Sequence, residues 1–564
     1  MIKTLKKIRI TFNLQTFLVL VVFIVGIAAQ LAVITPSGIY QNGDLVFWSA
    51  HGHDGTWHIA LMEEIKKGHP FQNPIFAGEK LTNYHFFSDI LPAMVSKYTG
   101  ISNENLYFRI FPLIYSIFLG ASTFYLTKKL TKNFSASIWA TIFTYFAGSF
   151  GYLIGKGESV FWATQIQSSS GNPPQIISNF LFLASIYYVL TYLDQTTKKL
   201  KVKYFLISFI LLGTISAFKI YAGVILLGTL SIIGTWNLVF KKDFRLFLLS
   251  LVSGIMALAL YLPNSSNNSS FLIYEPWWYI RTMIVEPSRL NLLDWELRRQ
   301  TYIYEHNWKR VIWLEGMGFL IFFFGNLGIR FLGLWEFVKT KAIFKVSIIL
   351  SIALPLIFLQ KGVASNTSQF LQYFILLFGI LAGIGTAKLL GKIKKPIYYI
   401  LCTIFLFSLM IPTQIKLLRE FYSRPAFAKI NSYELQALKF INKNTDTNAV
   451  ILTPPYNQYL DQKQITPNIW DWFDTSYVAA FSSRRTYFDD YEQVDIMGYD
   501  FKERLATKKI IFGNEDQNKI KEAILLTNAH LIYFPKDIKP KVELDKIGLS
   551  KIYENSSVEI WKID

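Results

Sequence analysis

Eleven apolar runs, each close to the length of a membrane span, recur over the first three quarters of the chain. A bilayer core about 30 Å thick is crossed by roughly 20 helical residues at about 1.5 Å each. This repetition predicts a polytopic α-helical membrane protein with about 11 transmembrane helices. The runs cover about 14–34, 107–126, 134–154, 175–193, 204–218, 221–240, 246–263, 311–333, 346–360, 368–387 and 397–413.

Composition excludes several other classes of protein. Of the 564 residues, 52% are hydrophobic and 17% are charged, whereas a soluble domain has about a quarter charged residues. The 16% of aromatic residues excludes a disordered chain. The single cysteine, Cys402, excludes a disulfide framework and a cysteine-based metal site.

The net charge of +19 reflects orientation in the membrane. Basic residues gather in every second connection between spans, as they do in cytoplasmic loops. The charge is therefore no sign of a nucleic-acid partner. We expect a multi-pass plasma-membrane protein with a cytoplasmic N-terminus and, after an odd number of spans, an extracytoplasmic C-terminus. The basic segments are the N-terminus, 127–133, 194–203, 241–245, 339–345 and 388–395.

Two parts of the chain have different patterns. Residues 1–418 are predicted to form the transmembrane domain, with a long first external loop over 36–106, called loop one below. Residues 419–564 are predicted to form a small extracytoplasmic α/β domain, called the C-terminal region below. Its expected strands are 449–453, 530–534 and 558–563, and its expected helices are 432–443 and 515–528.

Loop one concentrates side chains that can do chemistry, including five of the seven histidines. Asp54 and His58 are four residues apart and share a face if a helix begins near Asp54. Asp44 and Glu63 lie nearby. The alternative is a solvated loop with a capped interfacial helix. Histidine with carboxylates can bind Zn²⁺ or Mn²⁺, but no HExxH spacing is present, so the cofactor stays unknown and a divalent cation possible.

The rest of loop one is rich in turns and ends in a short apolar stretch. Tyr84 and His85 precede residues 86–98, which are apolar but too few to span a bilayer. Such a segment suits a helix lying along the membrane surface.

This order of features resembles the GT-C superfamily of polytopic glycosyltransferases. The resemblance rests on the first span, Asp54 at the head of an external helix, the Tyr84-His85 turn and the surface helix, and on segments beginning at Asn366 and Glu434. It is similar to the protein O-mannosyltransferase and aminoarabinose transferase type. The sequence departs from many members in having Gly55 where a second acid follows the first, and it lacks a WWDYG-type motif.

The resemblance implies transfer of a hexose or pentose from a polyprenyl-phosphate donor to a glycan, lipid or protein acceptor at the outer membrane face. Asp54 would be the base, with Asp44, His58 or Glu63 assisting, and inversion would need only one carboxylate. A basic side chain would bind the donor phosphate. Two further pairs of residues would contact the acceptor or loop one. The phosphate candidates are Lys219, Arg281 and Arg289, and the contact candidates are Tyr84, His85, Arg484 and Arg485.

Each of these cations also has a plain alternative. Lys219 lies between two apolar runs, where a charge costs roughly 3 kcal/mol, yet a lysine at a helix end can extend to the interface. Arg281 and Arg289 lie in an aromatic segment typical of membrane anchors. Arg484 and Arg485 could be ordinary surface charges.

Two other functions compete with glycosyl transfer. A transporter or flippase is one, although the spans contain few ionisable residues and no broken pseudo-symmetric halves. A non-catalytic scaffold with an external binding domain is the other, and it would tolerate the loss of Asp54.

Overall fold

The computed structural model describes residues 14–265, 272–456, 465–538 and 541–563. Within these residues, eight helical segments are long and apolar enough to cross a membrane, or nine if the bent pair α18–α19 forms one span. A polytopic helical membrane fold is thereby confirmed, whereas the count of 11 is not. The eight are α1 (Leu14–Leu31), α4–α5 (Asn103–Thr131), α8 (Pro173–Asp194), α9 (Lys198–Phe218), α10 (Ile220–Lys241), α11 (Arg245–Tyr261 and its extension to Asn264), α14–α15 (Trp308–Lys339) and α17 (Gln369–Leu390 and its preceding turn).

Three of the predicted spans form shorter or bent helices. The helix α6 (Phe134–Phe146) is followed by a 3₁₀ turn, and α16 (Ala342–Ile357) runs into the strand β4 (Phe358–Gln360). The last predicted span is α18 (Pro396–Met410), which bends by 47° into α19 (Pro412–Tyr422). Both short helices pack against α17, so their apolar side chains are buried by protein. Apolar composition alone therefore overstated their length.

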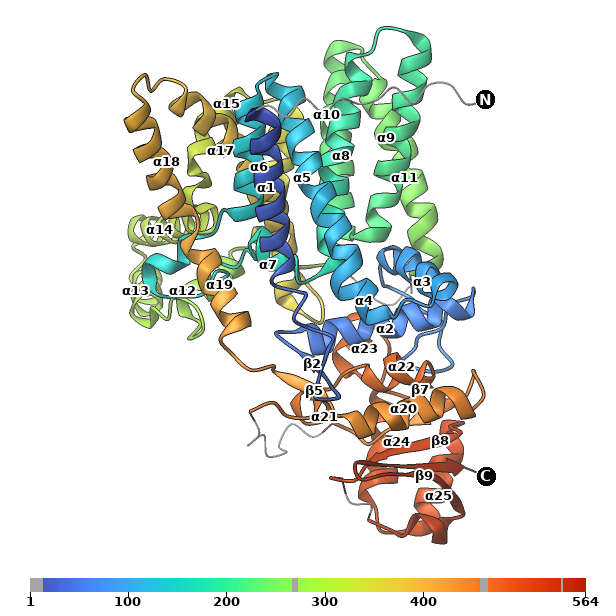
Figure 1. Cartoon of the computed structure of the whole chain (residues 1–564). Coiled ribbons are helices and arrows are strands. Elements are labelled where there is room, and N and C mark those ends of the chain that lie inside the picture. Colours follow the sequence, from blue (N-terminus) through green and yellow to red (C-terminus); the bar gives the residue numbers. More distant parts are fainter. Residues whose placement is uncertain (1–13, 266–271, 457–464, 539–540, 564) are drawn as a thin grey trace.

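The predicted break between the fifth and sixth runs is confirmed. The helix α9 ends at Phe218 and α10 begins at Ile220, with Lys219 extended between them. Basic turns such as those joining α8 to α9 and α10 to α11 lie at the end of the helix bundle away from the C-terminal region (Figure 1). The basic N-terminal residues fall outside the described part of the chain.

Loop one forms a compact unit beneath the bundle (Figure 1). Its strands β1 (Ile39–Gln41) and β2 (Asp44–Phe47) form a hairpin, followed by α2 (His51–Lys67) and, as predicted, a helix α3 (Phe87–Thr99). A third strand, β5 (Ala428–Ile430), pairs antiparallel with β2. Loop one and the beginning of the C-terminal region therefore share one sheet, which no local sequence pattern predicted.

The C-terminal region contains a five-stranded mixed sheet in the order β7-β6-β8-β10-β9. The parallel pairs are β6 with β7 and with β8, while β10 is antiparallel to β8 and β9. A C-terminal sheet domain is thus confirmed. The strands are β6 (Val450–Leu452), β7 (Arg485–Thr486), β8 (Leu531–Pro535), β9 (Leu549–Glu554) and β10 (Val558–Ile563), and the helices α20 (Ser432–Asn444), α21 (Ile469–Trp472), α22 (Tyr477–Ser482), α23 (Tyr491–Ile496), α24 (Lys502–Gly513) and α25 (Gln517–Thr527).

Candidate active site

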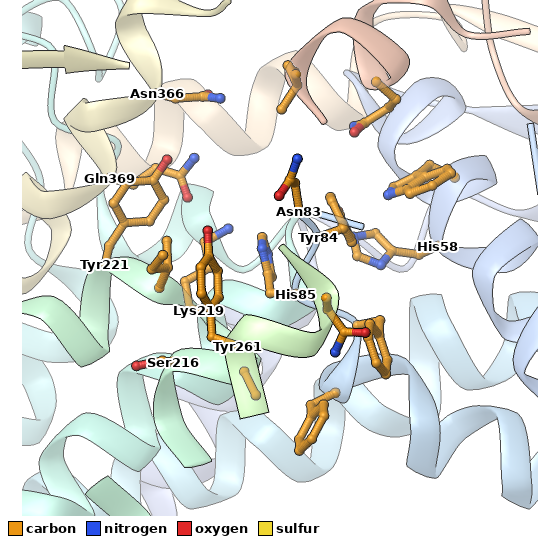
Figure 2. Close-up of a pocket in the computed structure, with 18 of the residues that line it drawn as sticks. His58, Asn83, Tyr84, His85, Ser216, Lys219, Tyr221, Tyr261, Asn366 and Gln369 are labelled. Atoms are coloured by element: carbon orange, nitrogen blue, oxygen red, sulfur yellow. The ribbon is translucent and has the colours of Figure 1, made fainter. Parts of the chain in front are cut away.

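A cavity of about 480 Å³ lies where the helix bundle, loop one and the C-terminal region meet. The head of α2 and the loop before α3 form one wall, the turn between α9 and α10 a second, and α23 a third. Figure 2 shows His58, Tyr84 and His85 of loop one facing Lys219, Tyr221 and Gln369 of the bundle across this space.

The head of α2 is packed closely because it contains two glycines. A Cβ atom at Gly52 would lie 2.7 Å from the Trp472 ring, and one at Gly55 would lie 2.5 Å from the Phe108 ring. The helix is therefore held between an aromatic ring of the C-terminal region and one of the bundle. This packing explains why no second acid follows Asp54, because a side chain at position 55 has no room.

We expect Gly55→Ala to lower the free energy of unfolding by about 1–3 kcal/mol, because the added methyl overpacks the contact with Phe108. Thermal unfolding of the purified protein in detergent would measure the change. Gly254→Ala is the matched control, since a Cβ at this helical glycine meets nothing within 4 Å. Equal melting temperatures for the two variants would contradict the packing argument.

Asp54 presents a carboxylate to the cavity. Its side chain is 39% exposed, and its Oδ1 lies 3.1 Å from Nδ1 of His53. Burial alone would raise the pKa of Asp54, but the hydrogen bond and charge of His53 bring it below the usual value. The group is thus an ionised carboxylate near neutral pH, as a general base must be.

Two further histidines of loop one line the cavity. His58 donates from Nδ1 to Asp89 of α3 at 2.9 Å, and its Nε2 lies 3.4 Å from the Tyr84 hydroxyl. His85 is neutral near pH 7, because burial and then the charge of Lys219 hold its pKa well below the usual value. Because His85 is neutral, the positive charge on this side of the cavity belongs to Lys219.

Lys219 is a buried cation facing the cavity. Its surface is only 4% exposed, and within the described part of the chain its ammonium group has no hydrogen bond or ion pair. Burial lowers the pKa of Lys219 to about 8, against the opposing effect of Asp54. The neighbouring lining is polar but neutral, with Tyr221, Tyr261 and Gln369 (Figure 2). An anionic ligand would supply the missing partner.

The other two acids predicted for the catalytic set do not reach the cavity. Asp44 accepts from Lys429 at 2.9 Å and from the Ser432 amide at 3.0 Å, so it joins β2 to the C-terminal region. Glu63 is nine residues beyond Asp54, about half a turn away around the helix. It accepts instead from Lys66 at 2.8 Å and Asn103 at 2.6 Å.

The two arginines predicted to hold a phosphate also lie outside the cavity. Arg281 is 3.8 Å from Glu315. The Arg289 guanidinium stacks on Trp162, 3.1 Å from the ring centroid, and donates to the Ser159 carbonyl at 2.7 Å. Both side chains connect α12 (Trp278–Val285) and the segment after it to the bundle.

The Arg484-Arg485 pair is buried in structural contacts. Arg484 donates to backbone carbonyls of Asn442 and Thr445 at 2.7 and 2.9 Å. Arg485 makes a two-pronged contact with Glu64 of α2, at 2.7 and 3.0 Å. Glu64 is 1% exposed, so this pair fixes the C-terminal region to loop one.

We expect Arg485→Gln to destabilise the fold by about 3 kcal/mol at neutral pH, because a buried carboxylate loses its main partner. Burial alone would raise the pKa of Glu64, but Arg485 and Lys67 lower it. The stability that this shift supplies is present above the ordinary carboxyl pKa and disappears as pH falls through the lowered value. The difference in the free energy of unfolding between the wild type and Arg485→Gln should therefore become smaller below about pH 4.

Chemical denaturation of the purified protein at pH 7 and at about pH 3 would measure this difference. Arg298→Gln, at an exposed arginine of α13 (Leu293–Tyr304), is the control for the charge change. A loss that stays constant with pH would contradict the assignment to Glu64.

Several lining residues were not predicted. Glu492 comes from the C-terminal region, and Gln360 and Tyr221 come from segments that the sequence shows only as ends of apolar runs. Asp490, which contacts the lining residue His53 from behind, was not predicted either. The one signal for Asp490 is an Asp-Asp pair directly after an aromatic stretch. Among the described residues, no group of three or more His, Cys, Asp or Glu is arranged to hold a metal ion.

Comparison with solved structures identifies the fold. No protein-family model and no curated protein matches the sequence. The Archaeoglobus fulgidus oligosaccharyltransferase in its apo form superposes with a TM-score of 0.55 and 12% identity, over 92% of this chain and 69% of that one. The same archaeon's AglB, in complex with an inhibitory peptide and a dolichol-phosphate, gives 0.52 and 13%, over 92% and 70%. ArnT from Cupriavidus metallidurans in the apo state gives 0.50 and 9%, over 97% and 98%.

Because the identities are low, these superpositions establish a shared fold and nothing beyond it. The solved neighbours are GT-C glycosyltransferases, so the resemblance inferred from loop one is confirmed at the level of fold.

Proposed function

We propose that this chain, whose fold is that of the GT-C glycosyltransferases, transfers a sugar from a polyprenyl-phosphate donor to an acceptor at the outer membrane face. The observation that carries the proposal is that one cavity contains both a partly exposed carboxylate and a buried cation that has no partner among the described residues. Asp54 and Lys219 both line the 480 Å³ space, and each matches one end of the bond that such a transfer exchanges.

Asp54 would act as the general base. It accepts the proton of the acceptor nucleophile while that nucleophile attacks the anomeric carbon. Lys219 would lie beside the phosphate oxygens, where negative charge grows as the sugar-phosphate bond breaks. Because a phosphate leaves without protonation, one carboxylate is enough, and attack opposite the leaving group inverts the anomeric centre.

The charge distribution supports an orientation in the membrane. The basic connections occupy the end of the bundle remote from the C-terminal region (Figure 1), and such connections remain in the cytoplasm. The N-terminus would then be cytoplasmic. Residues 1–418 would form the transmembrane domain, and residues 419–564 an external domain that closes the cavity from outside.

A lipid-linked donor fits the position of the cavity. The apolar residues Phe87 and Leu260 line the same space as Lys219, so a polyprenyl chain can leave the site toward the bilayer. The neighbouring fold of AglB has been solved with a dolichol-phosphate, which supports the same class of ligand here.

The test uses the purified protein in lipid nanodiscs with hexoses and pentoses carried on undecaprenyl and dolichyl phosphate. Native membranes would supply the acceptor, and mass spectrometry would detect the released polyprenyl phosphate. Release that depends on the protein supports the proposal. If an intact lipid-linked sugar crosses the proteoliposome membrane and no polyprenyl phosphate is released, the proposal is overturned in favour of a carrier. The absence of both activities would favour a scaffold.

A further inference from the structure

Asp490 connects the C-terminal region to the candidate base. It is completely buried, and its Oδ1 accepts from Nε2 of His53 at 2.9 Å. The other nitrogen of the same ring, Nδ1, lies 3.1 Å from Oδ1 of Asp54. One imidazole therefore bridges two carboxylates, the neighbouring Asp54 and an Asp490 that lies 437 positions from His53 in the sequence.

The surroundings hold this bridge in one orientation. Ser476 donates to the second oxygen of Asp490 at 2.6 Å, and the Gln493 amide donates to the first at 3.3 Å. The ring of Phe473 meets His53 edge-on, with centroids 5.1 Å apart. Both oxygens of Asp490 are thus used, and the imidazole has little freedom to rotate.

We propose that Asp490 is a positioning residue of the transfer reaction: through His53 it fixes the Asp54 carboxylate in the direction of the acceptor. The inference rests on the proposed function. It assigns a role in that reaction to the C-terminal region.

The bridge also sets the charge of the base. Burial alone would lower the pKa of His53, but Asp490 and then Asp54 raise it well above the usual value. The imidazolium in turn helps to hold the pKa of Asp54 low. Removing the charge of Asp490 should therefore let the pKa of His53 fall and that of Asp54 rise.

Other titratable groups also surround Asp54. They lie on four elements around the cavity. They are His51 and His58 on α2, Tyr84 in loop one, Lys219 between α9 and α10, and Glu492 on α23.

Asp490→Asn isolates the charge from the structural roles of this residue. Asp490 precedes α23 with a left-handed backbone, φ 53°, and caps the helix. Asparagine tolerates that conformation and is an equally good N-cap. Its amide oxygen can still accept a hydrogen bond, so the fold should survive while the negative charge is lost.

The experiment follows polyprenyl-phosphate release by the purified protein over about pH 3 to 9, so that the acid limb of Asp54 falls within the range. For Asp490→Asn we expect the turnover rate at neutral pH to fall about 10- to 100-fold, with little change in the donor KM. The acid limb of the pH profile should move to a pH about one unit higher, because His53 carries less positive charge beside Asp54 in this variant. Asp495→Asn, an exposed acid on the same helix, is the matched control.

A double-mutant cycle distinguishes positioning from general destabilisation. If Asp490 acts through His53, Asp490→Asn should have almost no further effect on His53→Gln. Additive losses, or an acid limb that stays at the wild-type pH, would overturn the inference. An active Asp54→Asn variant would instead overturn the proposed function itself, so the two failures can be told apart.

Discussion

Asp54→Asn is expected to lower the rate of sugar transfer by about 10³-fold while the protein still folds. The carboxylate is 39% exposed to the cavity and accepts from His53, so it is both ionised and accessible to an acceptor. An asparagine has nearly the same shape but cannot take a proton, and general-base catalysis contributes about 10²- to 10⁴-fold. Release of polyprenyl phosphate, measured with saturating donor, would give the loss directly.

Asp495→Asn provides the comparison for Asp54→Asn, because it makes the same chemical change at an exposed position of α23. We expect its turnover rate to equal that of the wild type. Melting temperatures of both variants should match the wild type within a few degrees. Wild-type turnover by Asp54→Asn would exclude this carboxylate as the base.

Lys219→Gln is expected to reduce kcat/KM by about 10²-fold, in the range found when one donor to a developing anion is removed. The ammonium group has no partner within the described residues, so the substitution removes a ligand contact and breaks no internal pair. Affinity for undecaprenyl phosphate alone, measured by thermal shift, should weaken as well.

The pH dependence gives a second test of Lys219. Its pKa is about 8, so the cation is fully present below that pH and is lost as pH rises through it. Wild-type kcat/KM should therefore decline above about pH 8, and Lys219→Gln should lack this basic limb. Lys241→Gln, at the exposed opposite end of α10, should keep it. A basic limb that persists in Lys219→Gln would assign it to another group.

The membrane fold could be predicted because its signal is local. A run of apolar residues identifies a helix wherever it lies, and the break at Lys219 was visible as a charge between two such runs. The lengths of α6 and α16 could not be read in this way. Both helices pack on α17, and a helix buried by protein can be shorter than the bilayer is thick.

In the candidate site, too, residues placed by local sequence could be predicted, and residues placed by long-range contacts could not. Asp54 and His58 were found because helical spacing puts them on one face, and that face lines the cavity. Glu63 is not among the lining residues, because the helix continues past the cavity. Asp490 was missed because its partner, His53, lies 437 positions away, and no periodicity reports a contact of that range. Arg289 looked like an anion site, but its guanidinium stacks on Trp162.

The 437 positions between His53 and Asp490 also determine when the site can form during synthesis of the chain. A ribosome adds about 5–20 residues per second, so roughly 20–90 s pass between synthesis of the two residues. Over that interval the transmembrane helices can insert while β2 and the head of α2 still lack their partners from the C-terminal region. The nascent chain is therefore a membrane protein well before its candidate site is complete, and a chain released early would be inserted but inactive.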